Sequence, residues 1–176
     1  MNMTGPAQSD TVAADAVGDL YRAHGLGLIR FALMLVGDQC TAEDVVQEAF
    51  LALYRGWDRV EDPGSALGYL RAAVLNGARS VHRGRRRSRA RLLRSVQHAP
   101  PVWSAESAVM ERADRRAVLA AVARLPRRQR EVLALRYYLD LSEQESAGIL
   151  GVARGTVSST AARALSVLVR QFEEEQ

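Results

Sequence analysis

SEQESAGILGVARGTVSSTAARALSVLVR, residues 142–170, is the stretch that decides the fold of the C-terminal half of this chain. Ser142 and Glu145 form the S-x-x-E pattern of a capping box, which predicts a short helix beginning there. Gly151 fits the left-handed residue that commonly ends such a helix. A longer helix is predicted over about 154–172 because apolar residues recur there at helical spacing. The stretch therefore predicts two helices joined by a tight turn.

Each of the two predicted helices has an apolar face, and the second also has a distinct polar face. The small residue Ala147 permits a close crossing, and the apolar residues predict a shared core. The polar face has short side chains and an arginine at each end, which suits the major groove of DNA. A simple helical hairpin in an all-helical core is the alternative, because short helix pairs are common. The expected core residues are Leu150, Val152, Val157, Ala161, Ala164, Leu165 and Leu168, and the expected DNA-facing residues are Arg154, Thr156, Ser158, Ser159 and Arg163.

The rest of the chain also predicts helices, and no segment shows the alternation of a strand. Gly37 and Gly56 are expected to end helices, and Thr41 and Ser65 to begin them. Thr41 with Asp44 resembles a capping box. The expected helices span about 15–36, 41–55, 65–82, 106–125 and 126–138, followed by the two C-terminal helices.

The predicted fold class is all-α, with two small helical domains joined by a flexible basic linker. The chain has 176 residues, enough for two small domains. A polar tail over 1–15 is expected to be loose. The first domain is expected over 16–84, the linker over 85–105 and the second domain over 106–176. The linker is placed there because the pair Pro100-Pro101 cannot lie inside a helix.

The positive charge of the chain is concentrated around this linker. The net charge is +4, the chain contains no lysine, and residues 63–105 contain no acidic residue. A long block of one charge sign repels itself unless a polyanion neutralises it, and arginine pairs well with phosphate. A nucleic-acid contact and a solvated linker are both consistent with this run. Its arginines are Arg71, Arg79, Arg83, Arg85, Arg86, Arg87, Arg89, Arg91 and Arg94.

Several classes of protein are disfavoured by the composition. Cys40 is the only cysteine, so an internal disulfide is impossible, and the three histidines share no metal-ligand spacing. The N-terminus lacks the basic region of a signal peptide, and the longest apolar stretch, Leu26 to Val36, is too short to span a bilayer. A reducing cytoplasm fits, and neither a metal nor another cofactor is expected.

A second motif lies in the helix predicted over 41–55. Asp44, Gln47 and Glu48 share one surface of this helix. Taken alone, such a surface is typical of a solvated helix face. A docking surface for a basic partner is the sharper interpretation, and it depends on the neighbouring motifs.

Together these motifs resemble those of the extracytoplasmic-function sigma factors, group 4 of the sigma-70 family. The stretch AEDVVQEAF, residues 42–50, is similar to the polymerase-binding helix of that family. Two motif sets in the family's order make the resemblance specific, and it extends over about 16–170. The pattern is most similar to the short SigE-like subgroup common in actinobacteria. The other matching segments are Leu20-Tyr21 and Leu35 to Asp38 for the first conserved region, Tyr69-Leu70 with Asn76, Arg79 and Arg83 for promoter melting, and Leu125 to Val132 through the helix-turn-helix for −35 recognition.

The resemblance implies a promoter-recognition factor that carries out no chemistry. It implies binding to core RNA polymerase, at the clamp helices of the largest subunit and the flap of the second subunit, and to promoter DNA. A separate anti-sigma factor is possible, and the free protein is expected to be a monomer. The implied polymerase-binding residues are Asp44, Gln47 and Glu48. The implied −10 contacts are Trp57, Tyr69, Asn76, Arg79 and Arg83, with the loop 57–64 forming a pocket for a flipped base; the −35 contacts are Arg154, Thr156, Ser158, Ser159 and Arg163.

The second predicted helix departs from the family at one place. The family often has Thr-Val-Lys-Ser-Arg where this chain has Thr156-Val157-Ser158-Ser159-Thr160. Two expected basic contacts are therefore missing. The family also has a later arginine in this helix, and of the expected basic residues only Arg163 remains. We expect weak −35 binding by the second domain with a shallow salt dependence, and a steep salt slope would count against this. Trp103, in the linker, is interpreted as a hydrophobic anchor.

Three other functions remain as alternatives. An enzyme is disfavoured because the sequence shows no phosphate loop, metal cluster or catalytic triad. A conventional helix-turn-helix repressor would explain 142–170 but not the first half. A sigma-like protein that binds polymerase but has lost promoter activity is consistent with the altered helix at 154–172.

Overall fold

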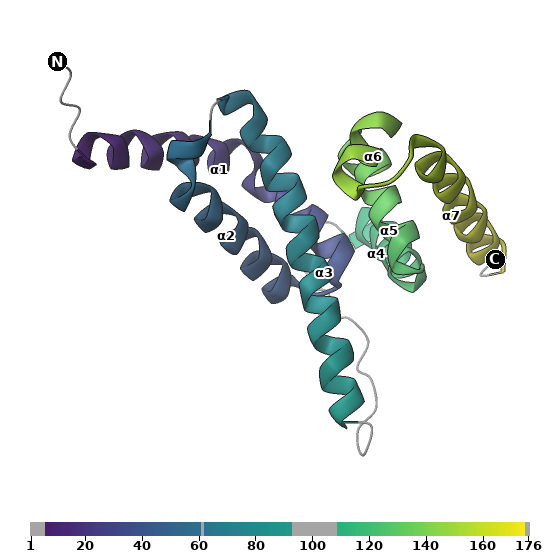
Figure 1. Cartoon of the computed structure of the whole chain (residues 1–176). Coiled ribbons are helices and arrows are strands. Elements are labelled where there is room, and N and C mark those ends of the chain that lie inside the picture. Colours follow the sequence, from purple (N-terminus) through teal and green to yellow (C-terminus); the bar gives the residue numbers. More distant parts are fainter. Residues whose placement is uncertain (1–5, 61, 93–108, 175–176) are drawn as a thin grey trace. The chain divides into compact units, whose positions relative to one another are not determined.

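The computed structural model describes residues 6–60, 62–92 and 109–174 (Figure 1). Every regular element within these ranges is a helix, which confirms the all-α prediction. The chain divides into two compact units, which confirms that it has two small helical domains. The first consists of the described residues of Met1–Ala32 and Cys40–Val96, and the second of those of Leu33–Gln39 and Gln97–Gln176. Among the described helices, none combines the length and hydropathy that a membrane crossing needs.

The first unit is built mainly from three long helices. Its core consists of apolar residues at helical spacing, such as Phe31, Val46 and Leu70, which are almost fully buried. The ring of Tyr21 contacts that of Phe50 edge-on, with 5.1 Å between centroids. The elements are α1 (Pro6–Val36, whose last residues belong to the second unit), α2 (Gln39–Arg55), η1 (Trp57–Arg59), η2 (Pro63–Ser65) and α3 (Ala66–Leu92).

Two expected helix starts are wrong. The loose tail expected over 1–15 is helical from Pro6 onward, since proline is favoured at the first helical position and alanines follow it. Ala13, within that segment, is only 5% exposed. Thr41 does not begin α2, which starts two residues earlier at Gln39. The turn at Gly37, with φ 88°, ends α1 as predicted, and α2 begins directly after this turn.

The arginine run is helical further than expected. α3 continues to Leu92, ten residues past the predicted end at His82, so residues 85–92 of the predicted linker are helical. Arginine has a high helix propensity, and the first helix-breaking residue, Pro100, comes later. Arg85 also anchors this part, because its Nη2 donates to Thr41 Oγ1 at 3.3 Å. The rest of the predicted linker, 93–105, and with it Trp103, lies outside the described residues.

The second unit contains the predicted C-terminal helices. Ser142 caps α6 in a capping box, and Gly151 ends it with φ 66°, both as predicted. The helix that begins after Pro126 widens into a π-helical turn at Ala134–Tyr138, which the sequence did not indicate. The elements are α4 (Val109–Arg124), α5 (Arg127–Leu133), η3 (Ala134–Tyr138), α6 (Glu143–Leu150) and α7 (Arg154–Glu174).

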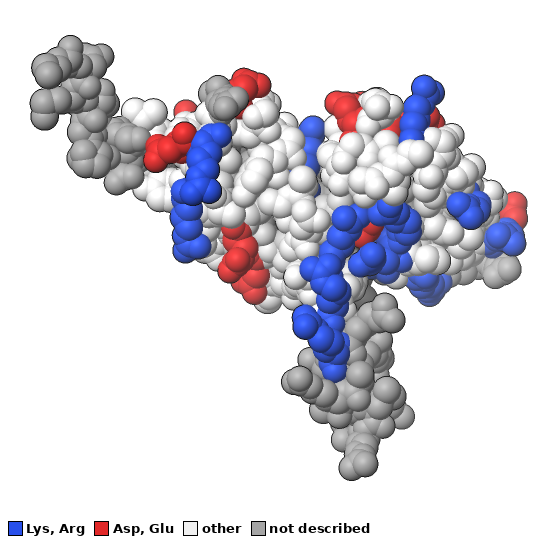
Figure 2. Space-filling view, viewed as in Figure 1, with Lys and Arg blue, Asp and Glu red and all other residues white. Residues whose placement is uncertain are grey.

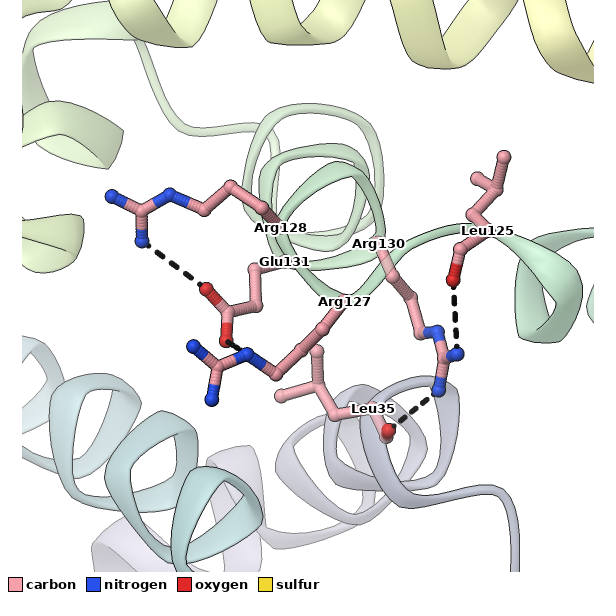
Figure 3. Close-up of polar contacts among 6 residues, drawn as sticks. All are labelled: Leu35, Leu125, Arg127, Arg128, Arg130 and Glu131. Atoms are coloured by element: carbon pink, nitrogen blue, oxygen red, sulfur yellow. Dashed lines mark hydrogen bonds and ion pairs between the residues drawn. The ribbon is translucent and has the colours of Figure 1, made fainter. Parts of the chain in front are cut away.

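One charged side chain of α5, that of Glu131, is buried, and another, that of Arg130, is half-buried (Figure 3). Glu131 is 1% exposed and pairs with Arg127 at 3.4 Å and Arg128 at 3.3 Å. Arg130 points the other way, and its guanidinium donates to the carbonyl oxygens of Leu35, Leu125 and Ala123. Burial lowers the pKa of Arg130, while Glu131 opposes that shift. These bonds satisfy buried backbone carbonyls of the second unit.

The core under the helix-turn-helix follows the predicted stripe with two exceptions. Val157, Ala161 and Ala164 are buried as expected. Leu165 is 39% exposed. It lies eight residues beyond Val157, which places it about 80° around the helix axis from the buried stripe. Thr160 is only 6% exposed, although it belongs to the segment compared with the family's basic contacts.

Candidate nucleic-acid and polymerase interface

An acidic face on α2 carries the three residues predicted to bind polymerase. Asp44, Gln47 and Glu48 are all exposed, and Figure 2 shows acidic side chains gathered over this helix. Within the described part of the chain, the side chains of Asp44 and Glu48 form no ion pair or hydrogen bond. The structure thus brings these residues together and leaves the two carboxylates available to a partner.

An apolar groove between α1 and α2 borders this face. Its volume is about 740 Å³, and Gln47 lies in its lining. Tyr21, Leu51 and Tyr54 also line it and are 49%, 43% and 39% exposed. Exposed aromatic and aliphatic side chains beside a charged rim are typical of protein interfaces.

A second pocket lies where α2 ends and the following loop begins. It has a volume of about 420 Å³, within the range of about 300–1,000 Å³ found for small-ligand sites. Tyr69 contributes an aromatic ring, 47% exposed, and Arg55 and Arg59 contribute positive charge. Trp57, also predicted to contact DNA, lies on η1 but is not among the lining residues.

The loop beside this pocket is held by Asp62. Its Oδ1 accepts from the backbone N–H of Gly64 at 2.9 Å, and its carbonyl accepts from the backbone and hydroxyl of Ser65. Ser65 directly precedes α3, as predicted, but its hydroxyl donates to this carbonyl. Asp62 therefore holds the turn that leads into α3, the helix that carries Tyr69.

A stripe along α3 continues from the pocket. Tyr69, Asn76 and Arg83 are seven residues apart and all exposed, so they follow one side of the helix with a drift of about 20° per step. Arg79 lies near the same side and is half-buried. Arg83 Nη2 donates to Ser80 Oγ at 3.0 Å. Figure 2 shows basic side chains along the described part of α3, which includes the exposed Arg87.

The predicted DNA-reading face lies at the N-terminal part of α7. All five of its predicted residues are exposed: Arg154, Thr156, Ser158, Ser159 and Arg163. Arg163 Nε donates to the Ser159 carbonyl at 3.1 Å, which directs its guanidinium along the helix. The backbone bond from Val152 N–H to the Ala147 carbonyl closes the turn that orients this face.

Glu143 lies beside this face and was not predicted. Arg154 Nε donates to Glu143 Oε2 at 2.8 Å, and Ser158 lies near the same carboxylate. The bond from Arg154, followed by the nearby Ser158 side chain, holds the pKa of Glu143 below its ordinary value. One of the five predicted DNA-facing residues, Arg154, is thus engaged by an acid in this structure, and Ser158 lies beside that acid.

Comparison with known families assigns both units. Residues 20–88 match the family described as Sigma-70 region 2, and residues 115–168 match Sigma-70, region 4. The chain belongs to the sigma-70 family. The sigma factor SigL of Mycobacterium tuberculosis, of the extracytoplasmic-function type, is 36% identical over 93% of this chain and 96% of its own length. The sigma-E factor of Streptomyces avermitilis is 32% identical over 83% of this chain and 79% of its own.

These relatives show that this sigma factor is of the extracytoplasmic-function, actinobacterial SigE-like type. Its function is promoter-specific transcription initiation by RNA polymerase, and sigma factors are initiation factors rather than catalysts. Solved structures share the fold. RpoE of Bartonella quintana, solved with the anti-sigma factor NepR, is 24% identical, with a TM-score of 0.73 over 90% of this chain and 99% of that one. CnrH, solved with the cytosolic domain of CnrY, gives 0.66 at 24% identity over 95% and 98%.

Two charged residues of this sigma factor, Arg55 and Glu143, were missed by sequence reasoning. Arg59 belongs to the loop 57–64 that was predicted to form the pocket, and the change of direction at Gly56 brings both Arg55 and Arg59 into the pocket with Tyr69. Their spacing around a helix-ending glycine was the available signal. Glu143 was missed because it lies eleven residues from Arg154, across the turn, where no helical periodicity connects them. The described residues contain no cluster of side chains suited to a metal ion.

Proposed function

We propose that the sigma factor binds core RNA polymerase through Asp44, Gln47 and Glu48. The observation that carries this is the pair of exposed carboxylates on α2 without an intrachain partner in the described residues. A basic surface on the clamp helices of the largest polymerase subunit would pair with them, setting orientation and association rate. The apolar groove beside Gln47 supplies apolar surface that a partner can bury. Charged contacts do not supply such surface, and binding affinity depends on side chains buried at the centre of the interface.

For the −10 element we propose that the pocket lined by Tyr69 receives a base flipped out of the duplex. Extruding a base costs a few kcal/mol, and stacking on an aromatic ring can offset about 1–3 kcal/mol of it. Tyr69 is the exposed ring in the pocket lining, and Trp57 lies on the adjoining loop. Asn76 offers an amide edge, and Arg79 and Arg83 hold phosphates of the separated strand.

For the −35 element we propose that the exposed face of α7 enters the major groove. The short side chains of Thr156, Ser158 and Ser159 let the helix approach the base edges, and Arg154 and Arg163 bind at its ends. Residues 106–176 would then form the −35 domain, 16–84 the −10 domain and 85–105 the linker between them. The second domain would also bind the flap of the second polymerase subunit.

A separate anti-sigma factor is a further proposed partner. The structure of RpoE with the anti-sigma factor NepR supports this. In the absence of a partner we propose that the protein is a monomer in the cytoplasm.

The test is transcription by core RNA polymerase supplemented with the purified protein across fragments of the source genome, with sequencing of the 5′ ends. We expect discrete start sites that share a −10/−35 pattern. The double variant Asp44→Arg with Glu48→Arg should lose both polymerase binding and these transcripts. Asp15→Arg with Glu173→Arg is the matched control, because it makes the same change of net charge at two other exposed acids.

Two outcomes would contradict the proposal. Tight DNA binding without polymerase, and no new transcripts with it, would favour a repressor. Polymerase binding without start sites would favour a sigma-like protein that has lost promoter activity. Equal loss of binding in the control variant would show that overall charge, rather than the α2 face, determines the interaction.

A further inference from the structure

The carboxylate of Glu143 occupies the start of the proposed −35 face. It accepts a hydrogen bond from Arg154 Nε at 2.8 Å, and the Ser158 side chain lies near it. The side chain of Glu143 is 27% exposed and that of Arg154 is 71% exposed, so the pair lies at the surface and can separate. Arg136, from η3, adds a weaker attraction to the same carboxylate.

Arg154 and Ser158 are the donors that a DNA phosphate would use at this end of α7. Guanidinium and hydroxyl donors bind phosphate oxygens as they bind carboxylate oxygens. Glu143 therefore supplies from within the chain the acceptor that the DNA backbone would otherwise supply. A donor that is already bonded to Glu143 contributes to DNA affinity only the difference in free energy between its bond to DNA and its bond to Glu143.

We propose that Glu143 competes with the DNA backbone for Arg154, and so weakens −35 binding until DNA displaces it. This rests on the proposed function, because it assigns a role within the same −35 face. The carboxylate also lies where its negative charge opposes an approaching phosphate. Binding at this face then includes the separation of the Glu143–Arg154 pair as a step.

The start of α6 does not depend on Glu143, so its proposed role can be distinguished from a structural role in the helix. The start of α6 is held by Ser142 and Glu145, whose side chains satisfy the first backbone donors. Glu143 points away from that arrangement toward α7. Glu143→Gln keeps the size of the side chain and an oxygen acceptor while removing the charge, so α6 is expected to remain intact.

The experiment measures binding of the polymerase holoenzyme, containing the full-length chain, to a duplex that spans a mapped −35 element. Glu143→Gln should bind about two- to five-fold more tightly, the range expected for losing an exposed ion pair. The slope of log affinity against log salt should become steeper by up to about 0.9, because one more phosphate contact forms. Glu173→Gln, at the far end of α7, is the control for net charge and should change neither value.

A double-mutant cycle tests the mechanism directly. With Arg154→Gln in place, Glu143→Gln should lose most of its effect, since the contested donor is gone. Fully additive effects would overturn the proposal. So would weaker binding by Glu143→Gln with loss of preference at one base pair, which would instead make Glu143 a base reader for a cytosine amino group.

Failure of this inference is distinguishable from failure of the proposed function. If wild-type holoenzyme gives start sites but Glu143→Gln binds like wild type, only the competition is refuted. If the wild-type chain gives no start sites, the proposed function itself fails.

Discussion

Replacing Gly77 with alanine would test a close contact between α2 and α3 in the first unit. A Cβ atom at this position would lie 2.9 Å from Val45 Cγ1, closer than real carbon contacts allow. Val45 is 7% exposed and β-branched, so its methyl group has little freedom to move aside. The added methyl group must therefore push the two helices apart or twist a buried side chain.

Two opposing effects determine how far Gly77→Ala changes the free energy of unfolding. Alanine is favoured over glycine in a helix by about 0.8–1 kcal/mol. Overpacking a well-packed core costs about 1–3 kcal/mol. The net change for Gly77→Ala is expected to be about 0–2 kcal/mol of destabilisation.

Gly84→Ala, in the same helix, is the matched control. No atom lies within 4 Å of a Cβ built at Gly84, so only the propensity gain applies, about 0.8–1 kcal/mol of stabilisation. This control also tests whether α3 is helical beyond His82. The difference between the two variants, about 1–3 kcal/mol, isolates the steric cost.

The assay is urea unfolding followed by the fluorescence of Trp57, which belongs to the first unit. A Trp103→Phe background removes the only other tryptophan. If Gly77→Ala and Gly84→Ala stabilise equally, the predicted contact with Val45 is wrong. Combining Gly77→Ala with Val45→Ala should recover part of the loss, because the clashing methyl group is gone; fully additive losses would refute the reasoning.

Two further predictions concern the second unit. Ser146 is fully buried in α6, and its hydroxyl has no partner in the described residues, so Ser146→Ala should stabilise this unit by about 1 kcal/mol, seen as slower hydrogen exchange of α6 amides. Faster exchange would indicate that the hydroxyl is satisfied. Gly151 has φ 66°, so Gly151→Ala should cost about 1–2 kcal/mol and lower the thermal midpoint of the second unit. An unchanged midpoint would mean that the turn accepts another conformation.

Local signals in the sequence predicted the elements that local chemistry determines. The capping box at Ser142 and the glycines at 37, 56 and 151 act on their immediate neighbours, and the structure has helix ends at all of them. The three residues predicted to form the acidic face of α2 needed only the helical period to be grouped together. Tyr69 was grouped with the later residues of α3 by the resemblance to the family.

Other features depend on the balance between opposing interaction energies, which the sequence pattern does not show. The arginine run was expected to be a flexible linker because like charges repel, but repulsion between neighbours costs only about 0.2–0.5 kcal/mol per pair. Arginine's helix propensity and the contact of Arg85 with Thr41 act in the opposite direction, and α3 continues. The π-helical turn at Ala134–Tyr138 likewise has no signal in the periodicity.

The structure also changes how the departure from the family in α7 is understood. Both Ser158 and Thr160 occupy positions where the family often has basic residues, but Thr160 is buried and only Ser158 reaches the exposed face. The exposed face therefore lacks one of the expected basic residues rather than two. Under the proposals above, the face is weakened by Glu143, which engages Arg154.

A weak −35 face is compatible with promoter recognition if the polymerase holds the chain in place. Once α2 is bound to the clamp and the −10 strand is engaged, contact between α7 and the −35 element becomes intramolecular. Its effective concentration is then set by the connection between the domains rather than by the concentration of free protein. Under that condition a modest contact by Arg163 adds selectivity without trapping the polymerase at the promoter. The competition by Glu143 would then adjust how strongly initiation depends on the −35 sequence, which predicts that Glu143→Gln helps most at promoters with a poor −10 element.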